Sequence, residues 1–210
     1  MFCRNCGAKA EKGDKFCANC GQQLNQSAQG SDKPLFKKIS LTALELMGAQ
    51  GEKWKRNTEL MPDDCWTLFM NVGKAQAGMF ISKNGLGADN ELKDKLEKSF
   101  FNAYSYGLWI WVAIKKHTDP KALNTVDFKY ADVQKNANRF MDEWEQNLDN
   151  IDKDIDDDVK PAFSIAQVKM QDAIDNDKLL NRDLSAEELW NLKSDLLGSI
   201  YRGYYLHKYF

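Results

Sequence analysis

Four cysteines near the amino terminus stand at a spacing that suits a metal ion. They form two Cys-x2-Cys pairs separated by ten residues, and they are Cys3, Cys6, Cys17 and Cys20. Zinc prefers four soft ligands arranged as a tetrahedron, with each sulfur about 2.3 Å from the metal. One pair can supply one edge of that tetrahedron and the other pair the opposite edge. The spacing therefore predicts one structural Zn²⁺ with four thiolate ligands and no coordination position left open for water.

Each cysteine pair belongs to the same short repeat. The first copy is Phe-Cys-Arg-Asn-Cys-Gly and starts at residue 2, and the second is Phe-Cys-Ala-Asn-Cys-Gly and starts at residue 16. The glycine that follows each pair, Gly7 or Gly21, can adopt a positive φ. A turn of this kind commonly points backbone N–H groups at the thiolates and offsets their charge. The segment 8–15 between the two turns is long enough for a short β-hairpin.

The amino-terminal segment closely resembles the short four-cysteine zinc-ribbon domains found at the amino termini of many bacterial and archaeal proteins. The resemblance covers residues 2–24, FCRNCGAKAEKGDKFCANCGQQL, which are about a tenth of the 210 residues. Both cysteine turns match throughout, while the gap between them is shorter than in larger zinc ribbons. The resemblance implies a structural zinc and a docking role toward protein or nucleic acid.

Other uses of paired cysteines fit this chain less well. A thioredoxin-like redox pair needs one Cys-x-x-Cys within a βαβ unit, whereas this chain has two such pairs and no βαβ pattern. A disulfide framework suits a secreted chain, and no signal peptide precedes the first cysteine turn. An iron centre of the rubredoxin type uses similar turns, so the ligands alone leave iron as an alternative to zinc.

Three further residues could do chemistry, and each has a simpler structural interpretation. Cys65 is expected in the first turn of a helix, where the negative charges of Asp63 and Asp64 disfavour a reactive thiolate, so a structural thiol is favoured. His117 and His207 are both expected in the last turns of helices. A partial positive charge suits the helix dipole there, and neither histidine has a sequence neighbour that suggests a catalytic triad.

An acidic run at residues 149–158, DNIDKDIDDD, matches a calcium-binding loop only in part. Asp152, Asp154 and Asp156 fit the first three ligand positions of an EF-hand, but Asp157 stands where the loop needs glycine. Apolar residues also keep a helical phase through the run. The sequence therefore favours an acidic, solvated helix face over a calcium site.

The composition along the chain predicts three parts. Residues 1–24 are expected to be the zinc ribbon, residues 25–34 a flexible linker, and residues 35–210 an all-α domain. A head of 24 residues cannot bury enough surface to fold without a metal or a disulfide, whereas a domain of about 170 residues can. The predicted fold class is a small four-cysteine zinc ribbon followed by an all-α helical bundle of five to six helices.

Hydrophobic periodicity after residue 35 predicts the helices of this bundle. They are expected at about 35–54, 62–84, 89–117, 125–159, from 161 to 174, and from 185 to 204. The third is apolar nearly all round in its second half and should lie at the centre of the bundle. Short connections favour antiparallel neighbours.

Several local signals refine these helices. Leu41, Leu44 and Met47 share one phase in the first helix. In the second, the small residues Gly73 and Ala77 should allow a neighbouring helix to approach closely. The sequence Asn84-Gly85 gives a carboxyl-terminal cap, and Ser185 with Glu188 predicts a capping box at the start of the last helix.

Charge and hydropathy limit the possible environments of the protein. The net charge of −2 gives no general argument for binding nucleic acid or an acidic membrane. The most apolar run, residues 100–114, would span about 22 Å as a helix, which is too short for a hydrocarbon core of ~30 Å. We therefore expect no membrane span. Thiols at metal-ligand spacing and the lack of an export signal favour the cytoplasm.

These features favour a non-enzymatic zinc-binding interaction protein, in which the ribbon docks a protein partner and the helical bundle acts as a scaffold. One alternative is a nucleic-acid-associated regulator that uses the ribbon and a basic neck around Lys37 and Lys38. The acidic run 142–158 would repel phosphate and counts against it. Another alternative is an enzyme with an apolar site among the aromatic residues of the bundle. A homodimer is also compatible with the surplus of aromatic residues.

Overall fold

The computed structural model describes residues 34–48, 63–87, 89–121, 155 and 159–206, and all secondary structure within them is helical. The described helices are α1 (Pro34–Gly48), α2 (Asp63–Lys83), α3 (Asn90–Thr118), α5 (Lys160–Asp175), α6 (Lys178–Asp183) and α7 (Ala186–Tyr205). The predicted all-α character of this part of the chain is confirmed. The segments 1–24 and 25–34, predicted as ribbon and linker, fall outside the described residues except for residue 34.

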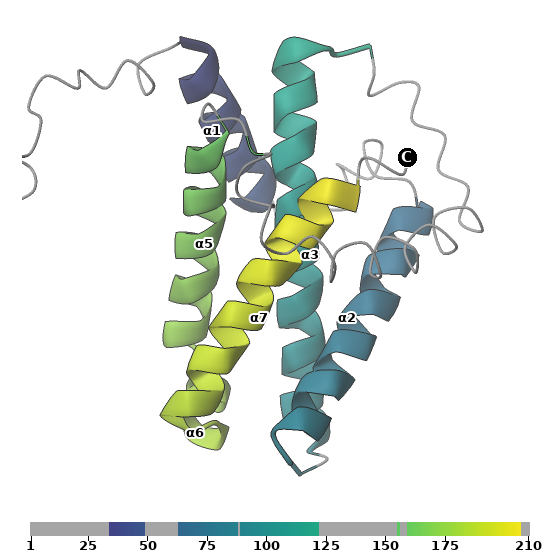
Figure 1. Cartoon of the computed structure of the whole chain (residues 1–210), viewed down its shortest axis with the longest axis vertical. Coiled ribbons are helices and arrows are strands. Elements are labelled where there is room, and N and C mark those ends of the chain that lie inside the picture. Colours follow the sequence, from purple (N-terminus) through teal and green to yellow (C-terminus); the bar gives the residue numbers. More distant parts are fainter. Residues whose placement is uncertain (1–33, 49–62, 88, 122–154, 156–158, 207–210) are drawn as a thin grey trace, which may run out of the picture.

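Helix α3 forms the centre of the bundle, as its all-round apolar sequence predicts. It contacts α1, α2, α5, α6 and α7, and the other helices surround it in Figure 1. Every residue from Ser99 to Ala113 is buried except Asn102. The buried hydroxyls of Ser99 and Ser105 donate to the carbonyl oxygens of Lys95 and Phe101, each at 2.9 Å. Polar side chains can therefore occupy this core because the helix satisfies their hydrogen bonds.

The ends of α2 and α3 follow the local signals in the sequence. Gly85 has a φ of 62°, and its N–H donates to the Ser82 carbonyl while that of Leu86 donates to the Ile81 carbonyl. This pair of bonds is a Schellman cap, in which glycine avoids the steric cost of the left-handed conformation. Helix α3 then begins after Asp89, whose carboxylate accepts a hydrogen bond from the Glu91 N–H at 2.9 Å.

Glycines set the distances between α3 and its neighbours. A Cβ atom placed on Gly73 of α2 would lie 3.0 Å from the Glu97 carbonyl oxygen of α3. This confirms the predicted close approach. The crossing of α3 and α7 is closer still, since a Cβ on Gly107 would lie 2.0 Å from the Ile200 carbonyl oxygen, and one on Gly203 would lie 2.1 Å from that of Tyr104. Both helices therefore need glycine at this crossing.

Helix directions depart in part from the antiparallel arrangement that short connections predict. Helices α2 and α3 run antiparallel, as do α5 and α7, but α3 and α7 run in the same general direction (Figure 1). At their crossing, Tyr104 of α3 lies against Gly203 of α7, and Gly107 lies against Ile200. Because α6 and the turns beside it reverse the chain after α5, α7 can return along α3.

Helix α6 is short and was not predicted. Its signal is Asp177, whose carboxylate accepts hydrogen bonds from the N–H groups of Leu179 and Leu180 at 3.0 and 3.1 Å. Next along the chain, Ser185 and Glu188 form the predicted capping box of α7. The Ser185 N–H donates to the Glu188 carboxylate at 2.6 Å, and hydrogen bonds from Ser185 lower the pKa of Glu188.

The structure corrects the predicted faces of two helices. Met47 of α1 is buried, but Leu41 and Leu44 are 51% and 43% exposed, because α1 turns Ile39, Ala43 and Leu46 inward instead. In α5 the sequence predicts an apolar face of Phe163, Ala166, Met170, Ala173 and Ile174, and this face is buried except for Ala173, which is exposed. Helical periodicity finds an apolar stripe but leaves its angular position uncertain by about one residue.

Two predicted helices extend beyond the described residues. Helix α1 is described to Gly48, and residues 49–54 of the first predicted helix lie outside the description. The predicted helix 125–159 also lies outside it apart from Ile155 and Val159. Both of these residues are buried, and neither is part of a helix. Among the described helices, none is long and apolar enough to cross a membrane.

Candidate functional site

The four candidate zinc ligands, Cys3, Cys6, Cys17 and Cys20, lie outside the residues that the structure describes. Their metal chemistry therefore rests on their residue types and spacing. Within the described ranges, no three side chains of His, Cys, Asp or Glu gather closely enough to hold a metal ion. The acidic run 149–158 also lies outside these ranges except for Ile155, so the calcium-loop comparison is not tested.

Two of the remaining candidates with reactive side chains lie in the end turns of described helices. Cys65 lies in the first turn of α2, as predicted. His117 lies in the last turn of α3, where its Nε2 atom is 2.8 Å from the Oγ1 atom of Thr42 in α1. This hydrogen bond ties the end of the central helix to α1, a role that the capping interpretation did not include. His207 is outside the described residues.

The aromatic side chains of α5 and α7 pack on one another. Phe163 stacks on Tyr201 with ring centroids 4.8 Å apart and meets Tyr204 edge to face at 5.1 Å. Tyr204 in turn meets Tyr205 edge to face at 5.3 Å. Offset and edge-to-face pairs of this kind stabilise a core. The sequence analysis allowed an apolar enzyme site among the aromatic residues of the bundle, including Tyr201, Tyr204, Tyr205 and Tyr209, and the first three of these tyrosines lie in this packed aromatic cluster. Tyr209 lies outside the described residues.

A titratable side chain is enclosed at the crossing of α3 and α7. Tyr104 is 1% exposed, and burial raises the pKa of its phenol above the ordinary value of 10.0. The positive charge of Arg202 and the side chain of Ser199 act in the opposite direction with smaller effect. Ser199 is itself buried and donates to the Asp195 carbonyl at 2.9 Å. The phenol is therefore neutral at physiological pH, which suits a structural group better than a catalytic base.

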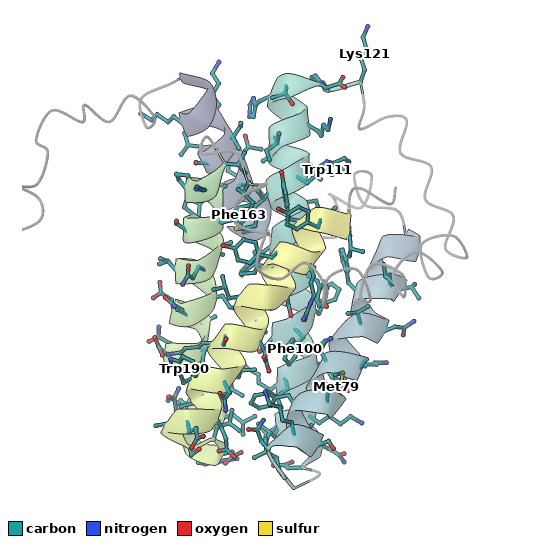
Figure 2. The ribbon with its side chains drawn as sticks, in the orientation of Figure 1. Met79, Phe100, Trp111, Lys121, Phe163 and Trp190 are labelled. Carbon is teal, nitrogen blue, oxygen red and sulfur yellow. The ribbon has the colours of Figure 1, made fainter. Side chains whose placement is uncertain are left out.

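The outer face of α5 and α7 carries a cavity of about 270 Å³. Its apolar lining includes the buried Met170 and Ile200 and the half-buried Leu197. Trp190 lines the cavity from α7 and is 70% exposed, the largest exposed fraction among the large apolar side chains of the described residues. Figure 2 shows Trp190 on α7 beside α5. The cavity lining thus contains both buried apolar side chains and the exposed indole of Trp190.

Polar groups complete the lining of this cavity. Gln167 and Gln171, one turn apart on α5, face Ser194 and Lys193 of α7. The Lys193 ammonium forms an ion pair with the Asp175 carboxylate, which is not part of the lining. The lining therefore offers amide and hydroxyl groups and one positive charge.

Sequence reasoning did not find this cavity, although one signal was present. Trp190 precedes Leu192 and follows Leu189, and the core stripe of α7 continues through Leu196 and Ile200. Trp190 stands beside that stripe, so its large aromatic side chain points away from the core. An aromatic residue next to the apolar phase of an amphipathic helix therefore predicts a large apolar side chain at the surface.

Comparison with known proteins identifies one segment of the chain. Residues 2–24 match the family model of the zinc-ribbon domain. The chain thus carries an amino-terminal zinc-ribbon segment, and this class of domain implies zinc binding. The match coincides with the residues that the cysteine pattern singled out. No curated protein and no solved structure matches the chain. The role of the helical body, residues 34–206, therefore has to be argued from its own side chains.

Proposed function

We propose that this protein is a zinc-binding interaction protein, in which the ribbon docks a protein partner and the helical body acts as a scaffold that contacts a second one. The observation that supports it most directly is the zinc-ribbon match over residues 2–24, which contain all four cysteines of the two pairs. Zinc-ribbon domains of this size have little surface of their own to form an active site. Docking is the role that fits such a small module.

The donor set supports a structural role for the metal. Cys3, Cys6, Cys17 and Cys20 supply four thiolates, which is the ligand type and number of closed structural zinc sites. With all four positions taken, the metal has no place for a substrate or an activated water. Zinc binding in such modules contributes about 10–16 kcal/mol at neutral pH, which amounts to their folding free energy. The zinc would thus hold the shape of the docking surface.

The helical body supports a scaffold role through its enclosed central helix and the exposed Trp190 beside a cavity. Helix α3 is enclosed by its neighbours, and the glycine crossing at Gly107 and Gly203 fixes α7 against it. On the outside of this core lies the cavity between α5 and α7, which the exposed Trp190 helps to line. Tryptophan at an exposed position beside a cavity is typical of a protein contact surface.

Metal content is the first test of this proposal. Full-length protein purified without added metal should contain one zinc per chain by inductively coupled plasma mass spectrometry. The Cys3→Ser/Cys6→Ser variant should contain far less, because two of its four thiolates are lost. Iron in place of zinc would replace the zinc assignment by a rubredoxin-type centre. Equal zinc in both proteins would contradict the assigned ligands.

Affinity capture tests the docking role. Tagged wild-type protein and the Cys3→Ser/Cys6→Ser variant would each be incubated with native lysate, with and without nuclease. We expect a defined protein partner that survives nuclease and is lost in the variant. Partners that vanish with nuclease would favour the nucleic-acid regulator instead. An unchanged set of partners in the variant would contradict docking by the ribbon.

A further inference from the structure

The outer side of α1 carries an apolar strip, called the α1 face below. It consists of Leu41 and Leu44, which are 51% and 43% exposed, and of the exposed Gly48 one turn further on. The exposed Lys37 and Lys38 extend this face toward the start of α1. Lysine is poorly placed there, because the amino-terminal end of a helix carries a partial positive charge. An element that covers the α1 face should therefore offer apolar side chains next to negative charges.

The neighbouring end of α3 adds further positive charge. The hydrogen bond between the Nε2 atom of His117 and the Oγ1 atom of Thr42 joins this end of α3 to α1. Lys116 in the last turn of α3 and Lys121 just after the helix are exposed, and Figure 2 shows Lys121 projecting from this end of the bundle. Asp119 stands between these two lysines in the sequence and offsets part of their charge. Within the described ranges, neither these two lysines nor the two of α1 form an ion pair. An acidic element at this end would therefore gain ion pairs and displace none.

One segment of this chain has the matching composition. Residues 122–154 lie outside the described ranges. Apolar residues recur in this segment at every third or fourth position, and they are Val126, Tyr130, Val133, Ala137, Phe140, Trp144, Leu148 and Ile151. The part 142–154 also contains six acidic residues and one lysine. On the helix predicted for this segment, the apolar stripe has to pack against an apolar surface. The segment and the α1 face are therefore complementary in both hydropathy and charge.

Both ends of this segment are attached beside α1. It begins after Lys121, shortly beyond the His117 side chain that bonds to α1. It ends before the buried Ile155 and Val159, which lead into α5, and α5 packs on α1 (Figure 1). A helix of about 20 residues spans ~30 Å, whereas the 15 residues of α1 span ~22 Å. The segment is thus long enough to cover α1 between its two points of attachment.

We propose that segment 125–154 binds the α1 face as a helix, with its apolar stripe on Leu41 and Leu44 and its acidic residues near the lysines at this end of the bundle. Because both of its ends are held nearby, its effective concentration at the α1 face is high. The bound segment would also neutralise the basic neck around Lys37 and Lys38, which would then not be free for nucleic acid. This inference goes beyond the proposed function and does not depend on what the ribbon docks.

Photo-crosslinking in the full-length protein tests which element lies on the α1 face. The photoreactive amino acid p-benzoylphenylalanine would replace Leu44 in one variant and Met79 in another. Met79 is the matched control, because it is a 64% exposed apolar residue on α2, toward the opposite end of the bundle from Lys121 in Figure 2. After irradiation, mass spectrometry should find position 44 joined to peptides from residues 125–154, and position 79 joined to none of them. In an equal mixture of ¹⁴N- and ¹⁵N-labelled protein, each cross-linked pair should carry a single isotope, because the contact lies within one chain.

Limited proteolysis measures how firmly the segment is held. Trypsin can cleave it after Lys135 and Arg139, and binding to the α1 face should slow cleavage at both positions. Leu44→Asp should speed this cleavage at least fivefold, because it removes an apolar contact and repels the acidic residues. Met79→Asp should leave the cleavage rate unchanged. Both substitutions replace exposed side chains, so the circular dichroism of the helical body at 222 nm should stay close to that of the wild type.

The charge of the α1 face is tested by the same measurement. Lys37→Glu/Lys38→Glu should speed cleavage of the segment about two- to tenfold, since exposed ion pairs are each worth little. In the wild type, cleavage should become faster as salt is raised, because salt screens these pairs. The variant should lose most of this salt dependence.

Several outcomes would overturn the inference. Cross-links from position 44 to residues outside 125–154, or no cross-links at all, would show that the segment does not lie on the α1 face. Cross-linked pairs that combine both isotopes would assign this face to a second copy of the chain. Cleavage rates that are equal in the wild type and in Leu44→Asp would show that the segment is not held there. None of these outcomes bears on the ribbon, whose docking is tested by the cysteine variant.

Discussion

Tyr104 illustrates how burial changes the chemistry of a single residue in this protein. Its phenol is enclosed between α3 and α7, and burial raises its pKa above 10.0 even though Arg202 lies close enough to lower it. A group whose pKa is raised on folding stays neutral in the native state while the unfolded chain ionises. Its contribution to stability is therefore fully present below about pH 10 and is lost as the pH rises through the native pKa.

Comparison of the wild type with the Tyr104→Phe variant should reveal this pH dependence, because the variant lacks the phenol. As the pH rises from 9 to 11, the free energy of unfolding of the wild type should fall by about 1 kcal/mol more than that of the variant. Urea denaturation followed by circular dichroism at 222 nm would measure both curves. Curves that stay parallel up to pH 11 would show that the native phenol ionises as readily as the unfolded one.

Asp177 provides a second prediction at the scale of one residue. Burial alone would raise its pKa, but the hydrogen bond from Lys95 and those from the Leu180 and Leu179 N–H groups outweigh burial and lower it below 3.8. The stability that this carboxylate contributes is present above pH 3.8 and is lost as the pH falls through its native pKa. Asp177→Ala should cost about 1 kcal/mol at pH 7, because the amino-terminal cap of α6 is lost.

The Asp177→Asn variant separates the cap from the charge. Asparagine can still accept the backbone hydrogen bonds, so its cost at pH 7 should be smaller than that of alanine. Because asparagine does not titrate, the variant should also lose less stability than the wild type between pH 5 and pH 3. Equal costs for both substitutions at pH 7 would show that the ion pair with Lys95 matters more than the cap.

At the scale of whole helices, the crossing of α3 and α7 depends on the absence of two side chains. Gly107→Ala and Gly203→Ala would each place a methyl group near 2 Å from a backbone carbonyl oxygen of the other helix. Helix backbones cannot yield locally in the way that a flexible side chain can. We expect each substitution to reduce the free energy of unfolding by about 3 kcal/mol or more, measured by urea denaturation.

Gly198 is the matched control for these two glycines. It lies in the same helix as Gly203, but a Cβ atom at this position would meet nothing within 4 Å. Gly198→Ala should therefore stabilise the protein by up to about 1 kcal/mol, because alanine favours the helical conformation. The prediction is that Gly198→Ala raises the free energy of unfolding, whereas Gly107→Ala and Gly203→Ala lower it. Destabilisation by all three substitutions to a similar degree would show that the close crossing is not what sets the cost.

At the scale of the whole molecule, the main question is whether the ribbon and the helical body fold independently. We predict that they do, because a structural zinc would supply the folding free energy of the ribbon and the described core of the helical body is formed by its own helices. Cys17→Ser should remove the zinc and unfold the ribbon. The melting temperature of the helical body, followed at 222 nm, should not change. A large fall in that temperature would show that the two parts are packed together.

The sequence by itself determined the features that depend on residues close together in the chain. The candidate zinc ligands could be singled out because two residues between paired cysteines is a spacing that suits a metal site. The caps at Gly85 and at Ser185 were predictable for the same reason, since their hydrogen bonds join atoms only a few residues apart. The burial of α3 followed from its composition alone, because an all-round apolar helix has to be covered.

Only the tertiary structure decided which residues face each other across helices. The sequence does not distinguish Gly107 and Gly203, which meet a neighbouring backbone, from Gly198, which meets open space. The exposure of Leu41 and Leu44 and the cavity beside Trp190 were likewise invisible in the pattern. These properties depend on the direction and rotation with which helices pack. Those are set by the sum of many weak contacts between distant parts of the chain, which no local pattern records.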